Sequence, residues 1–139
     1  NKQVLENKIP VIGICVGMQI ISKKSDEGEL EGLGWIDAQV KKFEVSKLTQ
    51  KPHLPHMGWN TFKKEKENSI LNELEPDKGF YFLHTYYFSC NNSADILTST
   101  VYGDRYTSAV NHENIYGVQF HPEKSHSNGV QLLKNFANL

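Results

Sequence analysis

Near its start the chain reads Ile9-Pro10-Val11-Ile12-Gly13-Ile14-Cys15-Val16-Gly17-Met18-Gln19. Residues 9–14 of this segment are apolar and rich in β-branched side chains, which predicts a buried strand. Residues 16–22 have the pattern of the start of a helix, so the strand is expected to turn directly into a helix. The turn, Gly13-Ile14-Cys15-Val16-Gly17, has a potential nucleophile between two glycines, which is the layout of a nucleophile elbow. A buried cysteine in a tight turn is the alternative interpretation.

An elbow holds its nucleophile at the tip of a turn that is too tight for neighbouring Cβ atoms. In that position Cys15 would lie at a helix N-terminus, where the positive end of the helix dipole favours the thiolate. We therefore expect a lowered pKa for the Cys15 thiol and a nucleophilic role for its sulfur.

The sequence after the elbow predicts a β-rich region. Strand-like stretches occupy residues 35–43, 80–84, 96–102, 106–110 and 115–120. Turn signals at Gly103-Asp104 and His112-Glu113-Asn114 separate the last three stretches, which predicts a β-meander.

The C-terminal segment predicts a helix that packs on the sheet. Val130, Leu133 and Phe136 recur at helical spacing, and Ser127 or Asn128 is the expected N-cap. With the strand–helix unit at the start of the chain, this pattern favours a mixed α/β domain.

Composition and charge narrow the class of protein. The 139 residues contain 38% hydrophobic and 22% charged residues, which predicts one globular domain over residues 1–139. The formal charge of −1 favours neither a nucleic acid nor a membrane as partner. No apolar run reaches the ~18 residues of a membrane span, so the cytoplasm is the expected compartment.

Neither a cofactor nor a metal site is expected. The two cysteines, Cys15 and Cys90, are too few for a disulfide framework and lack zinc-site spacing. His53 and His56 stand three residues apart in a proline-containing stretch without further ligands nearby, which argues against a metal site.

A second candidate element is His121-Pro122-Glu123, which follows the last expected strand. A residue before proline is driven into an extended conformation, so the side chains of His121 and Glu123 can face one another. A cysteine nucleophile needs an imidazole base, and the imidazole needs a carboxylate to orient it. A surface turn at a strand end is the alternative interpretation.

These motifs resemble those of the class I glutamine amidotransferases, with residues 13–19 as the nucleophile motif and residues 117–123 as the base motif. Within that family the chain is similar to glutaminase subunits of imidazole glycerol phosphate synthases. The additional matches are Pro55-His56-Met57-Gly58-Trp59-Asn60, Tyr81-Phe82-Leu83-His84-Thr85-Tyr86 and His121-Pro122-Glu123-Lys124-Ser125. The resemblance implies a flavodoxin-like sheet with helices on both faces and an added β-meander.

The resemblance also implies a role for each matched residue. Cys15 would attack the side-chain amide of glutamine, His121 would be base and then acid, and Glu123 would orient His121. The implied oxyanion donor is the N–H group of Val16. Four positions match those that bind glutamine: Gly17, Gln19, Thr85 and Tyr86. Three positions match the interface with the synthase partner, a (β/α)8 barrel that receives the ammonia. Trp59 and Asn60 would lie toward the ammonia exit, and Lys124 would face the partner.

The match corresponds to roughly the last two thirds of a typical family member. In the family the second oxyanion donor comes from a glycine-rich strand several dozen residues before the nucleophile, whereas Cys15 is close to the start here. We therefore expect this chain to lack the N-terminal strands and the oxyanion strand, which puts its activity alone in question.

Two other functions stay open. The chain could be a paralogous amidotransferase that supplies ammonia for surface-polysaccharide sugars. It could also be a catalytically silent module that binds a partner. A general thiol hydrolase or peptidase is disfavoured, because Gln19, Thr85 and Tyr86 would have no role in one.

Overall fold

The computed structural model describes residues 1–26, 31–48 and 54–139. The strands are β1 (Val11–Ile14), β2 (Lys24–Ser25), β3 (Ala38–Lys42), β4 (His56–Asn60), β5 (Lys63–Lys64), β6 (Phe80–His84), β7 (Tyr86–Cys90), β8 (Ile96–Tyr102), β9 (Asp104–His112) and β10 (Ile115–Val118). The α-helices are α1 (Val16–Ile20) and α2 (His126–Ala137), and the short helical turns are η1 (Lys2–Glu6), η2 (Val45–Lys47), η3 (Ser69–Leu71), η4 (Ser93–Asp95) and η5 (Pro122–Lys124). Neither α-helix of this part of the chain is long and apolar enough to cross a membrane.

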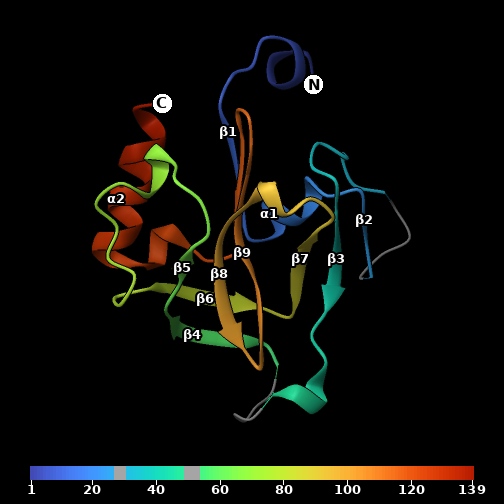
Figure 1. The fold of residues 1–139 in the computed structure, drawn as a ribbon, viewed down its shortest axis with the longest axis vertical. Helices are drawn as coiled ribbons and strands as arrows, with labels where there is room; N and C mark the ends of the chain where they lie inside the picture. The colour runs from blue at the N-terminus through green and yellow to red at the C-terminus, as the bar shows by residue number, and fades with distance from the viewer. Residues whose placement is uncertain (27–30, 49–53) are drawn as a thin grey trace.

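The strands form a mixed, curled sheet and a separate two-stranded sheet. The main sheet has the order β1-β10-β9-β7-β3-β2, and β8 pairs with β9 and β5. The pairs β1/β10 and β2/β3 are parallel, whereas the other pairs are antiparallel. In Figure 1 the strands β4 and β6 of the small sheet run across the lower ends of β8 and β9. The consecutive antiparallel strands β8, β9 and β10 confirm the expected meander.

The two α-helices pack on opposite faces of the main sheet. Successive side chains of a strand point to opposite faces, so neighbouring residues of β10 contact different helices. In β10, Ile115 lies in the same apolar cluster as Met18 of α1. The next side chain, Tyr116, lies with Val118 in a second cluster that includes Leu132 of α2. Figure 1 shows α2 on one side of β9 and α1 on the other. The expected α/β architecture with helices on both faces is confirmed.

Several element boundaries differ from the sequence-based expectation. The predicted strands 9–14, 35–43 and 115–120 are longer than the observed β1, β3 and β10. Residues 16–22 were expected to begin a helix, and α1 ends within this stretch, at Ile20. Four strands, β2, β4, β5 and β7, were not predicted. All four depend on partners distant in the chain, since β2 and β7 pair with β3, β4 pairs with β6 and β5 pairs with β8.

The predicted start of the C-terminal helix was wrong. Helix α2 begins at His126, and its N-cap position is Ser125 rather than Ser127 or Asn128. Asn128 is buried within the first turn, and its side chain accepts a hydrogen bond from the N–H of Glu75 and donates one to the Glu75 carbonyl. This residue therefore anchors a distant loop to the helix, a role that helix-capping preferences cannot predict.

Candidate active site

The turn between β1 and α1 has the backbone geometry of an elbow. Cys15 has φ +53° and ψ −111°, a region that residues other than glycine rarely occupy. A Cβ on Gly13 would collide with the carbonyl of Gly17, so the turn requires glycine there. A Cβ on Gly17 would meet nothing within 4 Å, so open space lies beside the turn at this position. The N–H of Cys15 donates to the Val118 carbonyl at 2.8 Å and ties the turn to β10.

Strand β6 holds both Cys15 and His121. Because β1 and β10 are parallel, with Ile14 opposite Val118, the residues that follow both strands emerge at the same edge of the sheet. The Cys15 thiol donates to the Leu83 carbonyl at 3.7 Å. The backbone N–H of His121 donates to the carbonyl of Tyr81, two residues earlier in β6, at 2.8 Å.

His121 and Glu123 form the expected pair. The distance between Nδ1 of His121 and Oε1 of Glu123 is 2.8 Å. His121 is extended as expected before a proline, but Glu123 lies in the turn η5, so this turn and not a continuous extended segment brings the two side chains together. With Nδ1 bound to the carboxylate, Nε2 is the ring nitrogen left to accept a proton.

The expected lowering of the Cys15 pKa was wrong: the pKa of this thiol is raised. Burial is the main cause, and the negative charge of Glu123 raises the pKa further. Hydrogen bonds from the backbone of Val16 and the side chain of Gln119 act in the opposite direction without cancelling the effect of burial. Helix α1 has five residues, so its dipole is small. A base must therefore remove the proton before the sulfur can react.

The expected glutamine-binding residues belong to two segments, α1 and the junction of β6 with β7. Gln19, on α1, donates from Nε2 to the side-chain oxygen of Gln119 at 3.3 Å. Thr85 connects β6 to β7 and Tyr86 is the first residue of β7, so both lie directly beyond the part of β6 that contacts Cys15. The carbonyl of Tyr86 accepts a hydrogen bond from Nδ1 of His84 at 2.7 Å.

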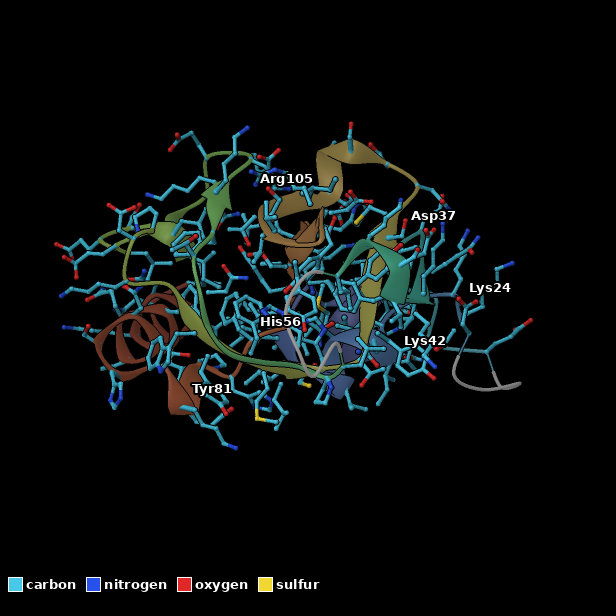
Figure 2. The ribbon with its side chains drawn as sticks, turned by 90° about the horizontal axis from the view of Figure 1, so that it is seen from below. Lys24, Asp37, Lys42, His56, Tyr81 and Arg105 are labelled. Carbon is cyan, nitrogen blue, oxygen red and sulfur yellow. The ribbon has the colours of Figure 1, made fainter. Side chains whose placement is uncertain are left out.

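Two of the three expected interface residues, Trp59 and Lys124, lie next to the ring of Tyr81. The Trp59 side chain is 49% exposed, stacks on His126 at 5.3 Å and meets the edge of Tyr81 at 6.2 Å between ring centroids. Lys124 Nζ lies 6.0 Å from the centroid of the Tyr81 ring. In Figure 2 Tyr81 lies beside α2.

Asn60, the third expected interface residue, belongs to a different environment. Its Nδ2 donates to the Val101 carbonyl at 2.8 Å and lies 3.3 Å from Nε2 of His56. Successive side chains of β4 point to opposite faces, so Asn60 points away from the face that Trp59 occupies.

A buried cluster of His56, His84 and Tyr106 was missed from the sequence. Nδ1 of His56 lies 3.0 Å from Nε2 of His84, and the Tyr106 hydroxyl lies 3.2 Å and 3.1 Å from these same two nitrogens. Figure 2 shows His56 in the middle of the molecule. Burial lowers the pKa of His56 to about 4 and that of His84 to about 3, so both rings are neutral at pH 7. Both histidines belong to the motifs that carry the resemblance, but their contact depends on the pairing of β4 with β6.

The described ranges contain no group of three or more side chains placed to bind a metal ion. His53 of the considered histidine pair lies outside the described residues, and His56 is engaged in the cluster above. Cys90, in β7, has a pKa raised to about 12, mainly by burial.

Sequence comparison identifies similar proteins over nearly the whole chain. The family model "Glutamine amidotransferase class-I" matches residues 1–139. A protein from Leptospira borgpetersenii named imidazole glycerol phosphate synthase subunit HisH is 50% identical over 136 residues, 98% of this chain and 67% of that protein. The protein of the same name from Leptospira interrogans is 49% identical with the same coverage. The chain thus spans about two thirds of the length of these curated relatives.

Structural comparison agrees on the fold. A putative GMP synthase component from Thermoplasma acidophilum has a TM-score of 0.65 at 23% identity, covering 93% of this chain and 56% of that chain. A glutamine amidotransferase from Thermotoga maritima has a TM-score of 0.62 at 18% identity, covering 99% of this chain and 49% of that chain. At these identities the likeness concerns the backbone arrangement alone.

Proposed function

The chain belongs to the class-I glutamine amidotransferases, and on that premise we propose that it is the glutaminase subunit of an imidazole glycerol phosphate synthase, acting in histidine biosynthesis. The reaction is the hydrolysis of glutamine to glutamate and ammonia. The observation that supports the proposal most directly is the arrangement of Cys15 and of the His121–Glu123 pair against β6.

In the proposed reaction His121 removes the proton of the Cys15 thiol, and the sulfur attacks the side-chain carbonyl carbon of glutamine. The C–N bond then breaks, His121 returns the proton to the leaving nitrogen, and ammonia departs from a glutamyl thioester. Water attacks the thioester, releases glutamate and regenerates the thiol. Glu123, 2.8 Å from Nδ1 of His121, stabilises the imidazolium that forms.

The raised pKa of the thiol is consistent with this sequence of steps. A thiol that stays protonated at neutral pH reacts only when a base accepts its proton. Negative charge develops on the substrate oxygen during the attack. The N–H of Val16 is the proposed donor to this oxyanion, since Val16 follows the nucleophile directly.

Glutamine binding is assigned to both sides of the nucleophile. Gln19 and the backbone of Thr85 and Tyr86 would hold the amino-acid end of the substrate. The open space beside Gly17 supports an approach of the substrate to the turn from that direction.

The proposed partner is a (β/α)8-barrel synthase subunit that receives the ammonia. The relatives are named as subunits of a synthase, which supports a partner for this chain as well. The exposed Trp59 and the neighbouring Lys124 are the proposed contacts, because a half-exposed tryptophan is typical of interfaces. Asn60 is proposed to lie toward the ammonia exit, on the face of β4 opposite to Trp59.

The experiment measures glutamine-dependent ammonia release by the chain mixed with the synthase partner of the Leptospira borgpetersenii relative and its ribonucleotide substrate. The HisH subunit of that organism is the positive control. Labelling of the sulfur by the glutamine analogue diazo-oxonorleucine is followed by mass spectrometry. We expect Cys15→Ala to abolish release and labelling, and Cys90→Ala to retain both.

Three outcomes would contradict the proposal. Loss of activity in Cys90→Ala with retention in Cys15→Ala would reverse the assignment of the nucleophile. Binding to the synthase without ammonia release would favour a silent partner-binding module. Release that responds to a polysaccharide-sugar synthase but not to the histidine-pathway partner would favour the paralogous function.

A further inference from the structure

Gln119 is a fully buried polar residue next to the nucleophile. Its side chain has no solvent exposure. The backbone N–H of Gln119 donates to the Ser108 carbonyl of β9 at 2.9 Å, which fixes the point where the chain leaves β10. No role was predicted for this residue from the sequence, although it lies two positions before His121.

The amide of Gln119 connects two residues that the proposed function needs. Its Nε2 donates to the sulfur of Cys15 at 3.7 Å, and its Oε1 accepts from Nε2 of Gln19 at 3.3 Å. One end of the amide can only donate and the other can only accept, so the two contacts have fixed directions. A residue with the same shape but without this polarity would lose both.

We propose that Gln119 is a positioning residue of the glutaminase site, which holds the sulfur of Cys15 and the side chain of Gln19 in a fixed relation. The catalytic part of this inference rests on the proposed function, because it requires that the chain hydrolyses glutamine. Because Gln119 is buried, water does not replace its contacts, and the geometry is set before substrate binds.

Two consequences follow from the contacts. A hydrogen bond donated to sulfur favours the thiolate, so Gln119 partly opposes the effects of burial and of the Glu123 charge. A hydrogen bond accepted from Gln19 fixes the rotamer of that side chain, so Gln119 also affects the affinity for glutamine through Gln19.

The first test measures the reactivity of the sulfur and requires no glutaminase activity. In a Cys90→Ala background, the rate at which iodoacetamide alkylates Cys15 is measured as a function of pH, because this rate follows the thiolate fraction. Gln119→Met keeps the length of the side chain and removes the amide. We expect the midpoint of its profile to rise by about one pH unit relative to the background.

A matched control and a second variant keep this test decisive. Gln131→Met makes the same change on α2, where the amide contacts Asn135, and should leave the midpoint unchanged. If Gln119→Met fails to fold by circular dichroism, Gln119→Leu is measured instead. An unchanged midpoint in a folded Gln119 variant would overturn the proposal.

The second test separates positioning from a purely structural role. In the ammonia-release assay, Gln19→Met and Gln119→Met should each raise the KM for glutamine about tenfold. Since both disrupt the same contact, the double variant should raise KM less than the hundredfold that independent effects would produce. Fully multiplicative effects would overturn the coupling. If the chain releases no ammonia at all, the proposed function fails, while the alkylation profile still decides the role of Gln119 at the sulfur.

Discussion

Nδ1 of His56 lies 3.0 Å from Nε2 of His84 in the interior, where the ring of His56 is stacked between Phe82 and Tyr102. Two imidazoles this close share one proton between the facing nitrogens, so at least one ring must be neutral and present a lone pair. The contact joins the small sheet to the site, because His84 also donates to the carbonyl of Tyr86.

This pair predicts a loss of stability in mild acid. The folded-state pKa of His56 is about 4 and that of His84 about 3, both below the unfolded value of about 6.5. As pH falls below 6.5, the unfolded chain binds protons that the folded chain does not. The free energy of unfolding should therefore be highest above pH 6.5. It should fall towards pH 4 by up to about 1.4 kcal/mol per pH unit for each histidine.

Urea denaturation between pH 7.5 and 4.5 measures this slope. His56→Gln should reduce the slope, because one of the two titrating groups is removed. His126→Asn changes an exposed histidine and should retain the slope of the parent. A His56→Gln slope equal to that of the parent would show that the buried pair does not cause the pH dependence.

Gly13 and Gly17 should respond differently to the same substitution. In Gly13→Ala the new Cβ would collide with the Gly17 carbonyl, so the free energy of unfolding should fall by about 1–3 kcal/mol and glutaminase activity should be lost. In Gly17→Ala the Cβ enters open space, and an alanine in a helix is favoured by about 0.5–1 kcal/mol over glycine. Gly17→Ala should therefore stay as stable as the parent but bind glutamine more weakly. Chemical denaturation and the KM for glutamine distinguish the two, and equal stabilities would contradict the packing argument.

Glu123→Gln should separate thiol reactivity from catalysis. Removing the carboxylate leaves the imidazolium of His121 without its partner, so kcat should fall on the order of 10²–10⁴-fold. The Glu123 charge also raises the pKa of Cys15, so the alkylation profile should move to lower pH as activity falls. The control Glu113→Gln removes an exposed carboxylate that pairs with Lys8, and it should change neither readout. An alkylation profile that moves to higher pH in Glu123→Gln would contradict the assigned effect of the Glu123 charge on Cys15.

Trp59→Ala and Asn60→Ala test the proposed interface. Trp59 is half-exposed, so its loss should leave stability within about 1 kcal/mol but weaken binding to the synthase partner by about 2 kcal/mol or more. Asn60 bonds within the chain, to Val101 and towards His56, so its loss should mainly lower stability. Calorimetric titration with the synthase and urea denaturation measure the two effects. The idea fails if Trp59→Ala binds the synthase as the parent does.

Local sequence was sufficient to predict the elements whose geometry depends only on residues close together in the chain. The elbow around Cys15 requires glycine and a strand-to-helix turn, and both requirements are visible in five residues. The meander follows from alternating strands and from turn residues next to one another in the chain. The His121–Glu123 pair depends on a proline between two side chains, so its geometry is also local.

Distant contacts account for what sequence reasoning missed or misjudged. The raised pKa of Cys15 results from burial beneath segments far away in the chain, which outweighs the local hydrogen bond from Val16. Strand β4 exists because β6 pairs with it, and that pairing brings His56 to His84. Residue types and spacing thus specified which chemical groups the site could contain. Desolvation and hydrogen bonding between remote segments specified the protonation of those groups and the partners that hold them, because both effects require the folded chain to exclude water.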